Sequence, residues 1–226
     1  MSAPTPAPVP AISPFGDRAV EVAWSAPGVE AGAYAEALSD RALGLARVLR
    51  EGGGFTDVSA GYRSVLASFD PAAHTLEERE AAVRAALLLA PAAPPEGKLV
   101  DVPVAYGGES GPDLAALSEQ AGLSEAQAVE LHAGKTYRVC FLGFVPGFAF
   151  LSAAPSALHR PRHASPRARV PAGSVGIAGW QTGIYGQSSP GGWQIIGRTS
   201  FRPFQAGREP EFALQAGDRV RFVPST

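Results

Sequence analysis

Arginines without nearby carboxylates mark the part of the chain best equipped for chemistry. Between Leu131 and Arg208 the sequence has a formal charge of +9 and no Asp or Glu, whereas residues 1–130 have a charge of −10. Arg162, Arg167 and Arg169 are close together in this segment, and guanidinium groups bind carboxylate or phosphate bidentately. An anionic small ligand or an acidic partner surface therefore suits it, although a solvated loop would also explain these arginines.

Aromatic, glycine and histidine residues add further candidates, each with a simpler alternative. Tyr185 and Trp193 could wall a ligand cleft, or they could pack within a barrel. The run Ser189-Pro-Gly-Gly192 could present consecutive backbone N–H groups as an anion nest, or it could form an ordinary turn. His132 lies near the end of an expected helix, where the helix dipole alone would explain it.

Several familiar patterns fail on their spacing. Gly134-Lys135-Thr136 lacks the earlier glycine of a P-loop and lies between a helix and a strand, which is the reverse of the P-loop order. Ser174 lacks the flanking glycines of a nucleophile elbow. The four histidines show no metal-ligand spacing, and a single cysteine, Cys140, excludes both an intrachain disulfide and a cysteine zinc cluster.

Composition narrows the class of protein. No apolar window of about 18 residues is present, so we expect no membrane span, and Met1–Pro14 lacks the basic start of a signal peptide. The basic run is short and the net charge is −2, which argues against a nucleic-acid face. We therefore expect a cytoplasmic protein with neither a nucleic-acid nor a membrane partner.

The elements that must position these residues indicate an α+β fold, which begins with a small α+β domain at residues 1–97. Leu38, Ala42, Leu45 and Leu49 continue a helical spacing that starts at Tyr34, and Thr75 with Glu78 forms a capping box for a second helix ending before Pro91. Strands are expected at 19–24, 58–60 and 64–69, with a flexible or extended arm at 1–12 and a Pro-rich linker at 91–97. The helices should cover one face of the sheet.

Residues 98–226 are predicted to form an all-β barrel with a helical insertion. Strands are expected at 99–106, 137–144, 212–214 and 218–223. One short helix should include Leu114 and Leu117 and end at Gly122, and Ser124 with Gln127 should cap another. Between Val170 and Thr199, glycine and proline separate short apolar runs, which is typical of short strands joined by tight turns. Val145-Pro-Gly-Phe148 has the Pro-Gly centre that type II turns favour.

Four motifs, in this order, resemble the family of 5-oxoprolinase B subunits, also called the allophanate hydrolase subunit 1 or KipI family. They are Gly143–Phe148, Pro166–Val175, Gln181–Tyr185, and Ser189–Trp193 followed by Ile196–Thr199. The resemblance covers 98–226 strongly and 1–97 by layout, and it departs from the family at Gly186, where proline is usual. It implies a cyclophilin-like β-barrel domain after the small α+β domain.

The resemblance also implies a function. It points to the B subunit of a bacterial ATP-dependent 5-oxoprolinase, which works together with the A and C subunits to convert 5-oxoproline into glutamate. The C subunit of this enzyme is also called allophanate hydrolase subunit 2. Two alternatives remain open: a KipI-like inhibitor of a sensor histidine kinase, and an amidolyase or urea-carboxylase-type carboxyltransferase component.

Under the 5-oxoprolinase interpretation, the candidate residues take specific roles. Anions would be held by Arg162, Arg167 and Arg169, and the substrate would be hydrogen-bonded by Gln181, Thr182 and Ser189. The anion nest would be formed by Gly191 and Gly192. The cleft would be walled by Tyr185 and Trp193, and protons would be carried by His132. Lactam hydrolysis needs proton transfer, and this segment offers only histidine for it. We therefore expect the carboxylates, and the site for ATP with magnesium, to come from another chain.

Overall fold

The computed structural model describes residues 9–25, 31–91 and 97–225, with the backbone alone for 31–35. The chain divides into two compact units, Met1–Pro94 and Pro95–Thr226. Most of the predicted linker at 91–97 and residues 1–8 of the predicted arm lie outside the described residues. Within the described ranges, no helix is long and apolar enough to cross a membrane.

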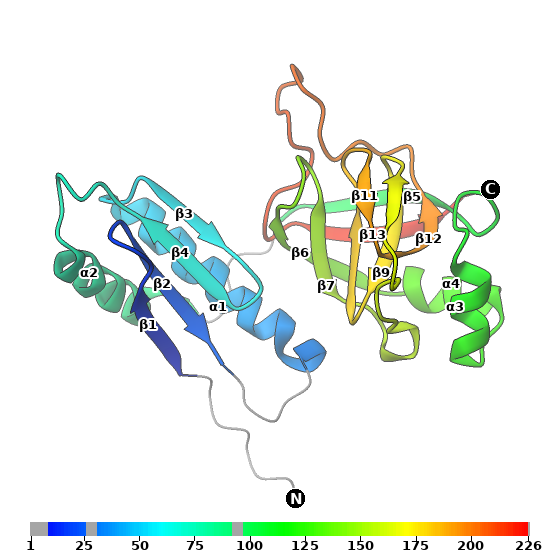
Figure 1. Ribbon diagram of the computed structural model, residues 1–226, viewed down its shortest axis with the longest axis horizontal. Helices are drawn as coiled ribbons and strands as arrows, with labels where there is room; N and C mark the ends of the chain where they lie inside the picture. Colours follow the sequence, from blue (N-terminus) through cyan, green and yellow to red (C-terminus); the bar gives the residue numbers. More distant parts are fainter. Residues whose placement is uncertain (1–8, 26–30, 92–96, 226) are drawn as a thin grey trace, which may run out of the picture. The chain divides into compact units, whose positions relative to one another are not determined.

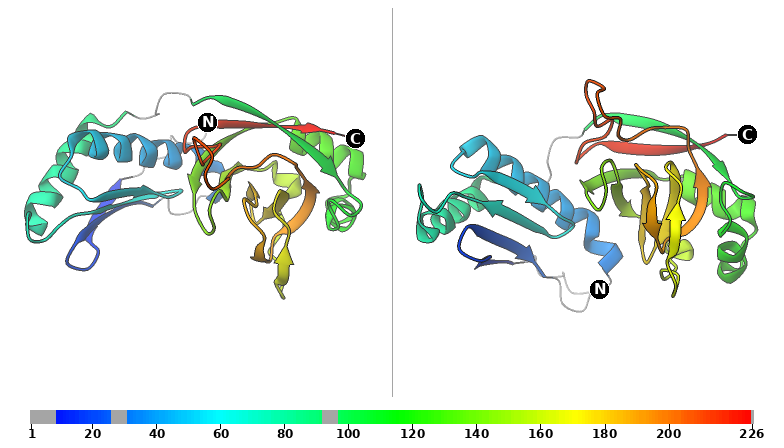
Figure 2. Two further views of the ribbon diagram at one scale, coloured as in Figure 1. Left: turned by 90° about the horizontal axis from the view of Figure 1, so that it is seen from above. Right: turned by 45° about the horizontal axis from the view of Figure 1, so that its top comes forward.

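The first unit is a four-stranded antiparallel sheet with two helices on one face (Figures 1 and 2). The order in the sheet is β1-β2-β4-β3. Its elements are β1 (Pro10–Pro14), β2 (Ala19–Trp24), α1 (Ala31–Gly52), β3 (Asp57–Ala60), β4 (Ser64–Ser68) and α2 (Leu76–Leu89). The predicted positions of the helices and of the last three strands are confirmed to within a few residues.

Local sequence explains these elements. Leu38, Ala42, Leu45 and Leu49 of α1 are buried in one cluster with apolar side chains of β2 and β4, as a helix with one apolar face requires. Thr75 caps α2 through the predicted capping box. The helix-breaking effect of glycine is visible just after α1, where two consecutive glycines take positive φ angles of 69° and 79°.

Residues 10–12 of the predicted flexible or extended arm are extended, but they belong to a strand, β1, that the sequence did not predict. This strand pairs with β2 along its length, with Ile12 opposite Val22. Prolines at both ends of β1 conceal the strand in the sequence. They are tolerated because β1 is an edge strand, which needs hydrogen-bond donors on one side only.

The second unit is a closed seven-stranded barrel, so the predicted α+β fold with a barrel is confirmed (Figure 1). Its strands follow the order β10-β7-β6-β13-β5-β12-β9. They are β5 (Leu99–Tyr106), β6 (Thr136–Leu142), β7 (Ala149–Ala153), β9 (Ser174–Ala178), β10 (Gln181–Ile184), β12 (Gln194–Arg198) and β13 (Arg219–Pro224). A two-stranded ribbon of β8 (Arg167–Val170) and β11 (Ser189–Gly191) lies outside this barrel order.

The helical insertion is also confirmed, between β5 and β6. It comprises α3 (Leu114–Ala121), which Gly122 ends in the left-handed conformation, and α4 (Glu125–Ala133), which Ser124 begins with a capping box. A single 3-10 turn, Ser156–Leu158, follows β7. Apolar residues from both helices and from all seven barrel strands form one core.

The predicted strand at 212–214 is wrong. Phe212 makes only an isolated bridge to Phe204, within the long connection from β12 to β13. That connection contains Pro203, Gly207 and Pro210. Turn-forming residues at this density interrupt an apolar pattern that is otherwise typical of a strand.

Candidate functional site

Two tight turns connect β6 to β7 and form one edge of the candidate site. Val145 N–H donates to Gly143 O at 2.8 Å, which makes Phe144 the centre of a three-residue γ-turn, and Phe148 N–H donates to Val145 O at 3.0 Å. Gly147 has φ 74°, as a type II turn requires at its third position. A Cβ at Gly147 would lie 2.5 Å from Phe204 Cβ, so the close approach also demands glycine.

A pocket of about 310 Å³ lies beside this turn. Its lining is mostly aromatic and contains one charged side chain, that of Arg162. The lining residues are Phe144, Phe148, Phe150, Arg162, Pro166, Tyr185, Pro190, Gly191, Gly192 and Trp193. We call it the aromatic pocket. It brings together five of the residues that the sequence singled out: Arg162, Tyr185, Gly191, Gly192 and Trp193.

The walls of the aromatic pocket are a small core, separate from that of the barrel. Phe148, Tyr185 and Trp193 are almost fully buried and cluster together. The ring of Phe148 meets Tyr185 at a centroid distance of 4.9 Å and Trp193 at 5.2 Å, both edge to face. Such contacts add to the stabilisation that burial provides. The walls are therefore preformed, which favours a binding site with few moving parts.

Gly191 allows the hydroxyl of Tyr185 to approach the β11 backbone. A side chain at this position would collide with Tyr185 Oη, whereas one at Gly192 would meet only ordinary contacts of 3.6 Å or more. Burial raises the pKa of the Tyr185 hydroxyl, against a hydrogen bond with the Trp193 backbone and the positive charges of Arg162 and Arg167. Tyr185 is therefore a neutral hydrogen-bonding group at neutral pH.

Arg167 does not line the pocket, because its guanidinium is bound to Asp113. The two nitrogens donate to Asp113 at 2.7 and 2.9 Å, and Asp113 also accepts the Ile195 N–H at 2.6 Å. His163 Nε2 lies 3.3 Å from the same carboxylate. This position does not support the predicted role of Arg167 in holding a substrate anion. Through Asp113, Arg167 instead joins three separated segments of the chain.

This chain does place one carboxylate of its own, that of Asp113, against the arginine-rich segment. Burial alone would raise its pKa, but hydrogen bonds from Arg167 and Ile195 N–H, the nearby His163 and the charge of Arg167 hold the pKa below its ordinary value. The carboxylate is therefore ionised and fully engaged. It positions its neighbours and is not available as an acid or base.

Two other predicted residues lie on the ribbon next to the pocket but do not line it. Arg169 is exposed and donates to Ser188 Oγ at 3.1 Å. Ser189 pairs with Val170, and its buried hydroxyl has no hydrogen-bond partner among the described residues. Neither position supports the direct substrate contact that the sequence predicted.

His132 and Thr182 lie inside the barrel, away from the aromatic pocket. Tyr106 Oη is 2.8 Å from His132 Nδ1, His132 Nε2 is 2.9 Å from Thr182 Oγ1, and Thr182 donates to Gly176 O at 3.0 Å. Because Thr182 donates its own proton to Gly176, Nε2 carries the imidazole proton and Nδ1 accepts from Tyr106. Gln181, at the start of β10, does not line the pocket either.

The burial of His132 does not fit the predicted role of a proton carrier. The side chain is 0% exposed and stacks on Phe222, and burial lowers its pKa to about 3. A neutral imidazole with both nitrogens engaged inside a closed core cannot exchange protons with a ligand. We therefore assign His132 to the barrel core.

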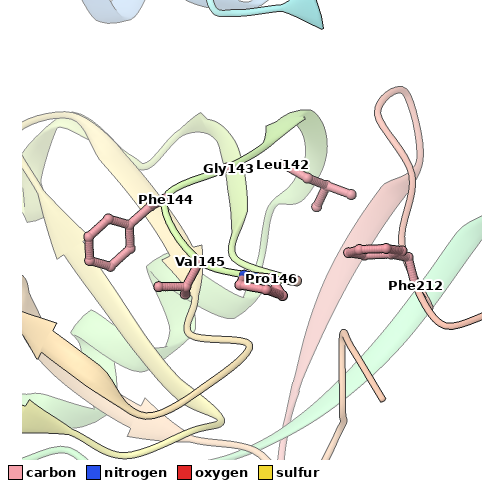
Figure 3. A pocket seen from close by; sticks show the side chains of 7 residues that line it. Leu142, Gly143, Phe144, Val145, Pro146 and Phe212 are labelled. Atoms are coloured by element: carbon pink, nitrogen blue, oxygen red, sulfur yellow. The ribbon is translucent and has the colours of Figure 1, made fainter. Parts of the chain in front are cut away.

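A second hollow, of about 410 Å³, lies on the other side of the Gly143–Phe148 turn. Figure 3 shows Leu142, Pro146 and Phe212 on one side of the turn and the ring of Phe144 on the other. Phe144 lines both hollows. The sequence did not single out this residue, although it lies within one of the four motifs.

Metal-ligating side chains do not gather near either hollow. Within residues 9–25, 31–91 and 97–225, no group of three or more His, Cys, Asp or Glu side chains could hold a metal ion. The aromatic pocket itself has no carboxylate or imidazole in its lining. It can bind a small anionic molecule, but it offers no strong acid or base.

Comparisons with known proteins identify the family of this chain. The family model described as "Carboxyltransferase domain, subdomain C and D" matches residues 10–214. A protein of Escherichia coli O157:H7, named as the B subunit of 5-oxoprolinase, is 55% identical over 130 residues, 58% of this chain and 60% of that protein. A protein of Bacillus subtilis (strain 168) with the same name is 48% identical over 126 residues, 56% of this chain and 52% of that protein.

A solved structure shows the same fold over nearly the whole chain. The crystal structure of TTHA0988 matches with a TM-score of 0.78 and 35% sequence identity, covering 92% of this chain and 40% of that chain. The matched segments span 60% and 52% of the two curated relatives. The chain thus spans little more than half the length of those relatives.

Proposed function

Because the chain belongs to the family described as "Carboxyltransferase domain, subdomain C and D", we propose that it is the B subunit of an ATP-dependent 5-oxoprolinase. In this reaction water adds across the lactam C–N bond of 5-oxoproline, and the ring opens to glutamate. The names of the E. coli and B. subtilis relatives support this substrate and a complex of several subunits. We place the reaction in the cytoplasm, with the A and C subunits of the enzyme as partners.

One observation carries the proposal: a preformed aromatic pocket has a single cation in its lining. 5-oxoproline is a small ring with a planar amide and one carboxylate. Phe148, Tyr185 and Trp193 provide apolar walls for a ring, and Arg162 can pair with a carboxylate. A pocket of about 310 Å³ is at the small end of the range for ligand sites, which suits a molecule of this size.

The same pocket supports a division of labour between subunits. Ring opening needs groups that transfer protons, and the pocket lining contains no Asp, Glu or His. His132 is buried elsewhere, and Asp113 is held by Arg167. The proton-transferring groups are therefore assigned to one of the two partner subunits, and this chain binds and orients the substrate.

The described residues do not fit ATP with magnesium. No side-chain cluster among them could hold a divalent ion, and a single arginine cannot neutralise a triphosphate in a largely apolar pocket. We place nucleotide binding on a partner subunit. No step of the reaction is assigned to ATP on this chain.

Reconstitution tests the proposal directly. The chain is mixed with its two partner subunits, ATP, magnesium and 5-oxoproline, and glutamate is measured with each component omitted in turn. We expect glutamate only from the complete mixture. Arg162→Ala should raise the KM for 5-oxoproline by roughly tenfold or more, the loss expected for a charged hydrogen bond. Its matched control is the exposed Arg169→Ala, which should leave KM unchanged. An assembled complex that makes no glutamate would overturn the proposal.

A carboxyltransferase component is the second candidate, favoured by the description of the matching family model. It would use the same pocket for a different amide. The reconstituted complex can be offered urea or a carboxylated urea in place of 5-oxoproline. Turnover of these amides without turnover of 5-oxoproline would select this candidate.

A further inference from the structure

We propose that Phe144 is a specificity-determining residue, whose exposed ring stacks on the flat amide ring of the substrate at the mouth of the aromatic pocket. This inference rests on the proposed function and deepens it. It adds a residue that the sequence did not single out, and it names what the pocket recognises: a planar cyclic amide, in preference to a puckered ring that carries the same carboxylate.

The backbone of Phe144 is held in an unfavourable conformation. Its φ is 69°, and no other non-glycine residue in the described ranges has a positive φ. It occupies the centre of a γ-turn closed by the 2.8 Å hydrogen bond from Val145 N–H to Gly143 O, a turn that is rare and strained with positive φ. Glycine would relieve this strain, yet the chain has phenylalanine here.

Burial does not compensate for that strain. The side chain is 65% exposed, and among the described residues its ring meets only that of Phe148, edge to face, at a centroid distance of 5.6 Å and an interplanar angle of 86°. A large aromatic side chain that is strained and exposed contributes little to folding. Strain of this kind at a pocket is a reason to infer a function.

Phe144 lines both hollows, and the aromatic and charged lining of the aromatic pocket makes that pocket the better site for a ring with a carboxylate. In Figure 3 the ring of Phe144 lies across the turn from Leu142, Pro146 and Phe212, which line the second hollow. On its own side, Phe144 shares the lining of the aromatic pocket with Arg162 and Trp193. A bound ring would therefore meet aromatic surface both from the wall and from the mouth.

This arrangement explains a preference for flat ligands. Aromatic rings pair best when their faces are offset-stacked or when an edge meets a face, and a lactam presents a flat amide to such surfaces. A saturated ring such as proline is puckered and cannot lie flat against Phe144. Arg162 would bind the carboxylate of either compound, so the discrimination falls on the aromatic residues.

The test compares Phe144→Gly and Phe144→Tyr with the unaltered chain in the complex with both partner subunits. For Phe144→Gly we expect an unfolding midpoint that is equal or higher, because strain is relieved, and a KM for 5-oxoproline that rises about five- to tenfold. Phe144→Tyr keeps the ring and should keep the KM. A residue with a purely structural role would instead lose stability in Phe144→Gly without a change in KM.

Phe212→Ala, on the other side of the turn, is the matched control. It should leave the KM unchanged. If Phe144→Gly has an unaltered KM, the proposal is wrong. It is also wrong if Phe144→Gly and Phe212→Ala weaken assembly with the partners to the same degree while KM stays constant, because the turn would then be a partner contact.

A direct binding measurement separates this proposal from the proposed function. 5-oxoproline, 2-pyrrolidinone, hydantoin and proline are titrated into the chain, and the indole resonance of Trp193 is followed by NMR. We expect the three amides to shift this resonance in the unaltered chain and to do so more weakly in Phe144→Gly. Proline, held through its carboxylate alone, should need about five- to tenfold higher concentration than 5-oxoproline for the same shift. If the complex makes no glutamate but these shifts occur, the proposed function fails and the role of Phe144 stands. No shift in the unaltered chain overturns that role.

Discussion

Arg167 donates two parallel hydrogen bonds to Asp113, at 2.7 and 2.9 Å, across 54 positions of sequence. Asp113 immediately precedes α3, and Arg167 begins β8. The Ile195 N–H adds a bond from β12 to the same carboxylate. One ion pair therefore fixes the relative positions of three segments, two of which continue into the lining of the aromatic pocket at Pro166 and Trp193.

Breaking this pair should destabilise the protein. Arg167→Ala leaves the carboxylate of Asp113 buried without its main partner, and we expect the free energy of unfolding to fall by roughly 2–3 kcal/mol. This is less than the full penalty for a completely buried pair, because the Arg167 side chain is 34% exposed. Chemical denaturation measures the change. The exposed Arg169→Ala serves as the control and should change stability by less than about 0.5 kcal/mol.

The double variant Asp113→Ala/Arg167→Ala should cost less than the sum of the two single changes, by at least about 1 kcal/mol. Simple additivity would contradict the pairing. A stable Arg167→Ala chain with weakened ligand affinity would return Arg167 to the substrate-binding role that the sequence first suggested.

Acid should remove the contribution of Asp113. Its folded-state pKa is below the ordinary value, so the unfolded chain binds more protons and stability rises with pH in that window. The contribution is complete above the ordinary carboxyl pKa of about 4 and is lost as pH falls through the lower folded-state value. The stability difference between the unaltered chain and Asp113→Asn, measured by denaturation, should therefore shrink below about pH 4. A difference that grows in acid would contradict this sign.

His132 should remain neutral throughout the physiological range, with its proton on Nε2. Burial lowers its folded-state pKa to about 3, while an exposed histidine titrates near about 6.5. Between these values the unfolded chain binds the extra proton, so His132 makes the fold less stable as pH falls below about 6.5. Nitrogen-15 chemical shifts of the imidazole report both tautomer and charge. A protonated ring at pH 6, or a proton on Nδ1, would contradict the hydrogen-bond chain from Tyr106 to Gly176.

Gly191 and Gly192 should respond differently to the same substitution. A methyl group at position 191 collides with the hydroxyl of Tyr185, whereas at 192 its nearest neighbours are 3.6 to 3.8 Å away. We expect Gly191→Ala to cost roughly 1–3 kcal/mol of stability, as overpacking does, and Gly192→Ala to cost much less. Thermal or chemical unfolding of the two variants makes the comparison. Equal effects would show that Tyr185 does not depend on this close approach.

Elements with strong local signals could be predicted from the sequence. The capping boxes at Thr75 and Ser124 formed as expected, as did the Pro-Gly turn before Phe148. These signals act over a few residues, so neighbouring sequence alone fixes them. The strand β1 was not predicted, because its prolines are typical of an arm outside the sheet. The strand at 212–214 was predicted wrongly, because an apolar run forms a strand only where another strand pairs with it.

Within the candidate site, too, local signals could be predicted from the sequence and long-range contacts could not. Four short motifs indicated the family resemblance and contain four of the five predicted pocket residues, because turns and strands of this kind need particular residues at fixed spacing; Arg162 came from the arginine cluster instead. The role of each charged side chain followed instead from its partner in space. Asp113 lies outside the carboxylate-free segment and yet binds Arg167, and His132 gives no local sign that the barrel closes around it. Ion pairing and burial depend on long-range packing, which the chain acquires only when the barrel closes.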